Sequence, residues 1–202
     1  MRELVDSFYK ERSIVNHQIA SYNDFLERRL QHIVSNTTIG QEEEMERGYI
    51  YPEIEGYKIK FGKISVGKPE VKEADGTVRK LTPMEARLRD LTYEAPISLE
   101  FIPVKDDVEY DPETVRVGEL PIMIKSKACN LAKNSIEQDK GHELSYEEYD
   151  KMLQEYLEDP LDPGGYYISN GTERVLITVE DLAPNRVLVE KSSRYGRDIE
   201  VA

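Results

Sequence analysis

The sequence has little sulfur and no long apolar stretch. Its 202 residues include one cysteine, Cys129, which excludes an internal disulfide framework and favours a reducing compartment. No run of apolar residues approaches the roughly 20 that are needed to cross a bilayer. The N-terminus, Met1-Arg2-Glu3-Leu4, also lacks the apolar core of a secretory signal. We therefore expect a cytoplasmic protein without a membrane partner.

Basic residues are also in short supply. The chain has 27 Lys and Arg residues against 40 Asp and Glu residues, which gives a formal net charge of -13. Such acidity argues against a free-standing, non-specific nucleic-acid binder, because the affinity of that class rests on neutralising phosphates. The acids concentrate in three segments, 42–46, 106–113 and 137–162. A hydrophobic content of 39% still allows a packed core, so wholesale disorder is not expected.

The spacing motifs of common active sites are missing as well. The sequence has no CxxC, HExxH or Gly-Xaa-Ser-Xaa-Gly motif and no Walker-type loop, and its three histidines do not cluster. Lys125 and Lys127 could activate Cys129, although a small buried thiol is the simpler interpretation. Asp106 and Asp107 could bind magnesium, although a loop of solvated acids accounts for them more simply. The sequence predicts no self-contained active site.

Apolar residues at helical spacing predict three helices. Val15, Ile19, Tyr22 and Leu26 begin a one-sided stripe that continues through Leu30 and Ile33, which is typical of an amphipathic helix. Two further helices begin at capping boxes, in which a Ser or Thr precedes a Glu by three residues. The expected helices cover residues 13–34, 82–91 and 145–158, with boxes at Thr82/Glu85 and Ser145/Glu148.

Alternating apolar residues and strong turn signals predict antiparallel strands. Asp75-Gly76 predicts a two-residue hairpin turn between Val71 and Val78, and Asn170-Gly171 predicts a second hairpin. The expected strands cover residues 57–66, 97–104, 114–124, 166–169 and 172–179, and a further apolar alternation occupies 187–189. Helices mixed with hairpin-linked strands, without a βαβ rhythm, indicate the α+β class.

Four cations stand apart from the acidic segments. Lys125 and Lys127 follow an apolar strand, Arg174 lies within the second hairpin, and Arg186 comes later in the chain. An arginine in an apolar hairpin is costly to bury unpaired. Arg174 therefore either pairs locally, near Glu173 or with Glu180, or faces a polar partner such as nucleic acid.

Three stretches, in the same order, resemble the N-terminal region of the second-largest subunit of multisubunit DNA-directed RNA polymerases. They are residues 83–93 (PMEARLRDLTY), 118–126 (GELPIMIKS) and 162–175 (DPGGYYISNGTERV). Residues 21–26 are similar to an early helix of that family, and residues 180–189 are similar to its archaeal members.

The resemblance implies a fold, a role and partners. It implies a protrusion domain over residues 1–190, which forms a wall of the DNA cleft, and the start of a lobe domain or connector at residues 191–202. Family members run on for hundreds of residues, so we expect a fragment that is inactive alone within a nucleotidyltransferase complex. No cofactor is expected here, because the family's largest subunit holds the catalytic magnesium.

The implied partners are other polymerase subunits, DNA and RNA, and general transcription factors. Lys125, Lys127, Arg174 and Arg186 are the residues expected to face nucleic acid. An alternative remains open, in which the chain is an acidic interaction module that binds transcription factors or polymerase subunits without touching nucleic acid. An independent small enzyme is the least favoured interpretation, because no nucleophile, metal or cofactor constellation is present.

Overall fold

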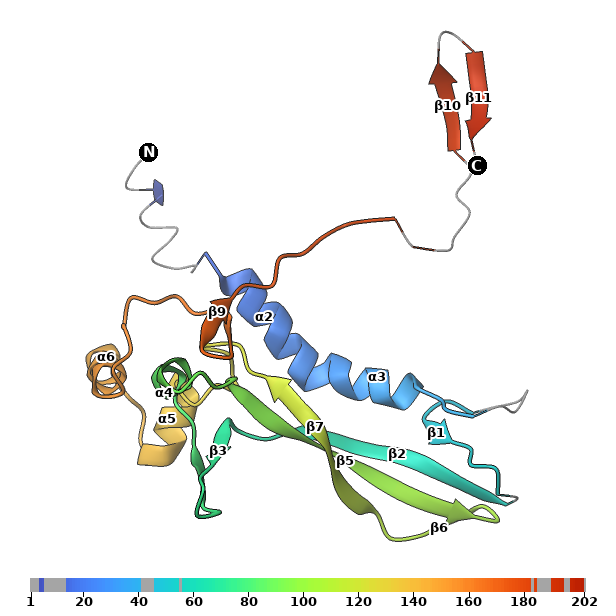
Figure 1. Ribbon diagram of the computed structural model, residues 1–202, viewed down its shortest axis with the longest axis horizontal. Helices are drawn as coiled ribbons and strands as arrows, with labels where there is room; N and C mark the ends of the chain where they lie inside the picture. The colour runs from blue at the N-terminus through green and yellow to red at the C-terminus, as the bar shows by residue number, and fades with distance from the viewer. Residues whose placement is uncertain are drawn as a thin grey trace.

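The computed structural model of the protein describes residues 4–5, 14–40, 46–54, 56–182, 184, 190–194 and 197–201. Figure 1 shows two main parts, a long helix beside an elongated sheet, and a group of short helices and hairpins at one end of that sheet. Helices and antiparallel strands occur together, which confirms the predicted α+β class.

One long helical run forms the N-terminal part. It consists of α2 (Asn16–Asp24), a π-helical turn η1 (Phe25–Arg29) and α3 (Leu30–Asn36). The predicted helix over 13–34 is confirmed from Asn16 onward, but the π turn was not expected. A π turn holds one extra residue and so rotates the following side chains around the helix axis. Ile33 is therefore exposed, and Val34 takes the half-buried position that the stripe assigned to Ile33.

The main sheet is antiparallel throughout. Its strands are β1 (Tyr49–Ile50), β2 (Tyr57–Val66), β5 (Glu94–Lys105), β6 (Val108–Glu109) and β7 (Glu113–Pro121). β2 pairs with one edge of β5, and β6 and β7 pair with different stretches of the other edge. The predicted strand over 114–124 ends at Pro121, although the three apolar residues that follow it are buried.

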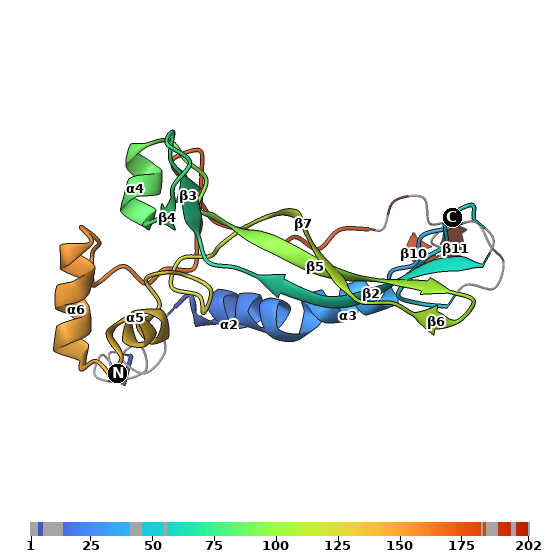
Figure 2. The ribbon, with the colours of Figure 1, turned by 90° about the horizontal axis from the view of Figure 1, so that it is seen from below.

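A glutamine fastens the long helix to the sheet. The side chain of Gln31 donates to the carbonyl of Gly62 at 3.1 Å and accepts from the amide of Ile64 at 3.0 Å. These two groups lie where the β2–β5 register shifts, so Gln31 satisfies backbone groups that the ladder leaves open. Figure 2 shows the helix running along the length of β2.

Three two-stranded hairpins accompany the sheet. They are β3 (Glu70–Lys72) with β4 (Val78–Lys80), β8 (Tyr167–Ser169) with β9 (Thr172–Arg174), and β10 (Glu190–Arg194) with β11 (Arg197–Val201). The Asn170-Gly171 turn is confirmed, with positive φ at both residues. The strand expected over 172–179 ends at Arg174, and the apolar alternation at 187–189 lies outside the described residues.

The Asp75-Gly76 hairpin forms, but its loop is longer than predicted. The strand ladder ends at the Lys72–Val78 pair, and the amide of Glu73 donates to the carbonyl of Thr77 at 2.8 Å. This bond therefore closes a loop of three residues, 74–76, instead of the predicted two. A two-residue turn, Asp106-Asp107, joins β5 to β6, and both of its residues have positive φ. The sequence did not predict this turn.

Three short helices lie at one end of the sheet, namely α4 (Pro83–Leu88), α5 (Lys133–Lys140) and α6 (Tyr146–Glu155). The capping box of Ser145 and Glu148 is confirmed. The box predicted at Thr82 is only half made, because the side chain of Glu85 bonds Arg79 and Arg89 instead of returning to the Thr82 amide. α5 was not predicted, since its N-cap is Ala132, which has no capping side chain.

Helix α4 also ends earlier than the sequence predicted, at Leu88 instead of about Leu91. Asp90 has positive φ, and the carbonyl of Leu91 accepts from the amide of Gly171 at 3.0 Å. The helix thus ends in a local turn at Asp90, where the amide of Leu91 donates to the carbonyl of Ala86 at 2.9 Å, and the contact with the distant hairpin follows that turn.

The core lies among these short elements. It contains Leu81, Ala86, Tyr93, Ala95, Ile122, Ile124, Cys129, Leu131, Ala132, Leu153 and Ile168. These residues come from α4, β5, β8, α6 and the segments that follow α4, β4 and β7, so the core holds the motif-bearing stretches together.

Candidate functional site

The turn at residues 162–165 is held by its own side chains. The Asp162 carboxylate accepts from the amide of Gly164 at 2.8 Å and from the hydroxyl of Tyr166 at 2.5 Å. Gly164 has a φ of +73, and a Cβ there would lie 2.7 Å from the carbonyl oxygen of Ile124. Glycine is therefore required both by the backbone conformation and by the close approach of another chain segment.

Lys125 clamps this turn. Its backbone has positive φ, and its ammonium donates to the carbonyl of Pro160 at 3.4 Å and to the carbonyl of Asp162. The side chain is only partly exposed. The structure thus gives Lys125 an intramolecular role, and its predicted orientation toward nucleic acid stays a prediction.

Lys127 lies nearby and is more open to solvent. Its backbone amide donates to the Asn23 side chain at 2.9 Å, which ties the loop to α2. Its ammonium forms an ion pair with Glu27 of η1, and both side chains are more than half exposed. Exposed pairs of this kind contribute little to stability, about 0–1 kcal/mol, so Lys127 can exchange Glu27 for another anion.

Arg174 ends β9, opposite Tyr167 in the register, and its side chain is exposed. Within the described part of the chain it forms no ion pair with Glu173 or Glu180. Glu173 instead accepts from Arg87 at 2.8 Å. The local pairing considered for Arg174 is therefore not made, and the cost of burying it does not arise. Arg186, the fourth predicted cation, lies outside the described residues.

Sequence reasoning missed Arg87, an arginine of this region whose side chain is only 20% exposed. Its guanidinium donates to Glu158 at 3.0 Å, to Glu173 at 2.8 Å and to the hydroxyl of Tyr166 at 2.6 Å. Burial raises the pKa of Glu158, and Arg87 opposes that shift. The only available signal was that Arg87 lies inside the first motif, residues 83–93.

Two carboxyl groups meet where β5 and β7 lie beside the core. Glu94 and Glu119 line a cleft of about 160 Å³, and Arg116 forms an ion pair with Glu119. Burial, and a hydrogen bond with Glu119, raise the pKa of Glu94 to about 7. The same hydrogen bond, followed by Arg116, lowers the pKa of Glu119. The pair therefore retains a proton to higher pH than an ordinary glutamate.

The residues considered for chemistry have structural surroundings. Cys129 is fully buried, burial raises the pKa of its thiol, and its sulfur lies 3.4 Å from the Tyr93 hydroxyl. Asp107 pairs with Lys58 at 2.9 Å. In the part of the chain that the structure describes, no three His, Cys, Asp or Glu side chains are grouped as metal ligands. Nor is any helix of that part long and apolar enough to cross a membrane.

The described cations therefore fall into two kinds. Lys125 and Arg87 bond to other parts of the chain, whereas Lys127 and Arg174 are exposed to solvent. Exposed Lys and Arg side chains can each donate to the oxygens of an anion such as a phosphate group.

Comparison with known proteins supports the family that the order of the motifs indicates. Residues 13–185 match the family described as RNA polymerase beta subunit. The chain is 50% identical over its whole length to DNA-directed RNA polymerase subunit Rpo2N of Methanocaldococcus jannaschii, of which it covers 37%. It is 44% identical, over 98% of its length, to subunit Rpo2 of Saccharolobus shibatae, of which it covers 15%. The chain thus spans well under half of these relatives, and it belongs to the RNA polymerase beta subunit family.

Proposed function

We propose that the chain is the N-terminal part of the second-largest subunit of an archaeal DNA-directed RNA polymerase, working in the cytoplasm as a structural wall of the DNA cleft. The observation that carries the proposal is the 50% identity to Rpo2N over the whole chain. The assembled enzyme transfers nucleotidyl groups, the magnesium ion belongs to the largest subunit, and this part supplies shape and contacts instead of reacting groups.

The proposal includes two parts of the chain. Residues 1–190 form the protrusion domain, and residues 191–202 begin a lobe domain or a connector. The β10–β11 hairpin supports a boundary near Glu190, because its two strands pair with each other across residues 190–201. Figure 1 draws this hairpin away from the main sheet.

Lys125, Lys127, Arg174 and Arg186 are the proposed nucleic-acid-facing residues. Arg174 is the strongest of them, because its exposed guanidinium has no carboxylate partner among the described residues. Lys127 can leave the exposed Glu27 for a phosphate, as surface pairs are weak. Contacts of this kind position nucleic acid and do not read its sequence.

Reconstitution of a polymerase from separate subunits tests this role. The wild-type chain, supplied with the remainder of the second-largest subunit, should enter the complex and support transcription, together with other subunits, DNA and RNA. Arg174→Ala and Lys127→Ala should each weaken promoter or elongation complexes and reduce the slope of log affinity against log salt by about 1. Lys63→Ala, which removes an exposed lysine of β2, is the matched control. An unchanged salt slope in both variants would contradict the proposal that these two residues face nucleic acid.

The alternative function, an acidic interaction module, predicts a different result. Under that alternative the chain captures general transcription factors or polymerase subunits equally well with and without DNA, and both arginine and lysine variants behave as wild type. A pull-down with and without DNA separates the two functions.

A further inference from the structure

Helix α6 ends with a leucine in a position that favours glycine. Leu157 has a φ of +60, and its amide donates to the carbonyl of Gln154 while the next amide, of Glu158, donates to Leu153. This is the Schellman arrangement, in which the residue in the left-handed region is usually glycine. Here a side chain with a strained backbone is also 68% exposed, so neither packing nor the helix end explains a leucine at this place.

A second leucine is exposed to solvent on a turn whose backbone is hydrogen-bonded on both sides. Leu161 is 90% exposed, although its backbone is well fixed. Its amide donates to the Asp159 carboxylate at 2.9 Å, and the Lys125 ammonium holds the carbonyls on either side of it. Because Pro160 and Pro163 further limit the backbone, Leu161 is preorganised, and a partner would lose little conformational entropy on binding it.

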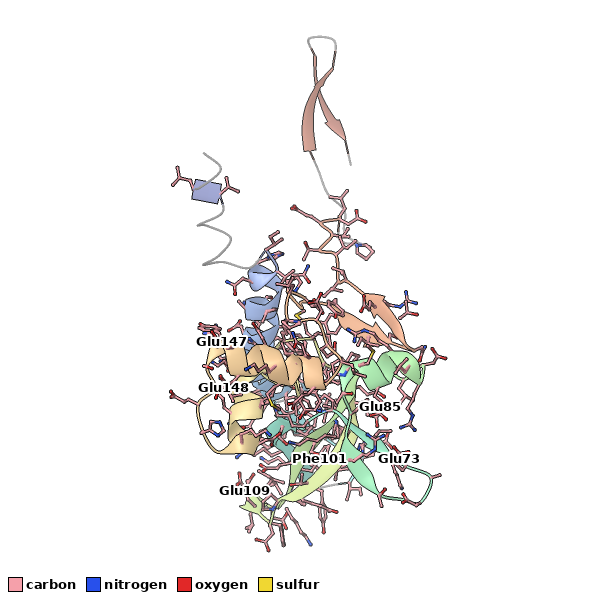
Figure 3. All side chains as sticks on the ribbon, turned by 90° about the vertical axis from the view of Figure 1, so that its left-hand side faces the viewer. Glu73, Glu85, Phe101, Glu109, Glu147 and Glu148 are labelled. Atoms are coloured by element: carbon pink, nitrogen blue, oxygen red, sulfur yellow. The ribbon has the colours of Figure 1, made fainter. Side chains whose placement is uncertain are left out.

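A third exposed leucine lies on α4, the helix that Arg87 joins to the end of α6. Leu88, at the end of α4, is 74% exposed, and it follows Arg87, whose guanidinium contacts Glu158. Glu158 in turn follows Leu157. We call Leu88, Leu157 and Leu161 the leucine surface. Figure 3 shows α4 and α6 on one side of the molecule, with Glu85 near the first and Glu147 and Glu148 at the start of the second.

The charges around the leucine surface restrict its partner. Residues 143–162 contain eight acidic residues and one lysine. Most of the acids are exposed, and they include Glu147, Glu155 and Asp159. Such a surface repels nucleic acid and favours a partner that carries lysine or arginine beside apolar side chains. The partner chemistry is thus the reverse of that expected around Arg174.

We propose that the leucine surface docks a basic, partly apolar segment of another subunit of the polymerase. This proposal rests on the proposed function, because it requires assembly with further subunits. The leucines enter apolar sites of the partner, and the acids of α6 pair with its cations. The α6 side of the molecule is then a protein interface, opposite in charge to the exposed Lys127 and Arg174.

Site-specific crosslinking in reconstituted polymerase tests the docking. A photoreactive amino acid replaces Leu161, and the same residue at the exposed Val78 of β4 measures chance collisions. The expected product joins position 161 to a lysine- or arginine-rich segment of one other subunit. Crosslinks to nucleic acid, to the same subunit or to an acidic segment would overturn the proposal, as would a yield no higher than that at Val78.

A second variant separates folding from docking. Leu157→Gly should raise the melting temperature of the chain, because glycine accepts positive φ, yet the double variant with Leu161→Ser should weaken its binding to the remaining subunits about tenfold. Unchanged binding would overturn the proposal. Failure of the wild-type chain to enter the polymerase would overturn the proposed function and this inference together, whereas incorporation with no crosslink at position 161 would overturn this inference alone.

Discussion

The guanidinium of Arg87 donates to both carboxylate oxygens of Glu158, at 3.0 and 3.2 Å. The side chain of Glu158 is only 7% exposed, so this ion pair is largely shielded from water. It joins α4 to the chain that leaves α6, and Arg87 extends the link to the β8–β9 hairpin through Glu173. Two of the three regions that carry the family resemblance, residues 83–93 and 162–175, therefore depend on one arginine for part of their mutual arrangement.

Arg87→Ala should lower the free energy of unfolding by about 3 kcal/mol, because it leaves the Glu158 charge buried without its partner. Urea unfolding at pH 7, followed by circular dichroism, measures the loss. Arg28→Ala is the control, because it breaks an exposed pair with Asp24 and should cost less than about 1 kcal/mol. Equal losses in the two variants would contradict a structural role for the Arg87–Glu158 pair.

Glu94→Gln should change how stability depends on pH. The pKa of Glu94 in the folded protein is about 7, above its ordinary 4.5, because of burial and the hydrogen bond with Glu119. The folded state thus keeps a proton that the unfolded state releases. The stability that this proton supplies is fully present below pH 4.5 and is lost as the pH rises through about 7.

Glutamine keeps the neutral form at every pH, so the variant should gain stability relative to wild type between pH 5 and pH 8. Urea unfolding at the two pH values gives the comparison. Glu113→Gln, at an exposed position of the same strand as Glu119, is the matched control. If Glu94→Gln shows the same difference from wild type at both pH values, the raised pKa is wrong.

Gly164→Ala should destabilise the fold by about 3 kcal/mol, because the new Cβ adds a clash with the Ile124 carbonyl to the cost of positive φ. Gly76→Ala supplies the matched control. Gly76 has a φ of +87 with no atom within 4 Å of the new Cβ, so only the backbone cost of about 1 kcal/mol applies. The difference between the two variants in thermal unfolding measures the cost of the clash with the Ile124 carbonyl. Equal losses of stability would contradict the close approach of that carbonyl to Gly164.

Ser145→Ala should lower the free energy of unfolding by about 1 kcal/mol through loss of the α6 capping box. Thr82→Ala should cost less, because Glu85 does not return a hydrogen bond to the Thr82 amide. Circular dichroism during thermal unfolding compares the two. A larger loss for Thr82→Ala would show that the reciprocal bond adds nothing at Ser145.

Features whose hydrogen bonds close within a few residues were predictable from the sequence. Ser145 and Glu148 are three residues apart, and Asn170-Gly171 form their turn by local backbone preference. α5 was missed, because Ala132 gives no cap signal. Glu85 was assigned to a capping box, but two arginines compete successfully for its carboxylate.

The candidate site was predictable only in part. The order of the motifs led to the polymerase beta subunit family, which the comparisons confirm. The roles of individual cations were harder to foresee. Lys125 is engaged by carbonyls 35 and 37 residues further along the chain, and Arg87 by acids 71 and 86 residues away.

The sequence by itself determined the α+β class, the capped helices, the Asn-Gly hairpin and the family, because each depends on neighbouring residues or on the order of motifs. Only the tertiary structure decided that Arg87 is largely shielded and paired while Arg174 is exposed, and that Leu157 and Leu161 remain outside the core. The physical reason is distance along the chain. Burial and ion pairing depend on which remote segments pack together, and no local pattern of residues specifies that.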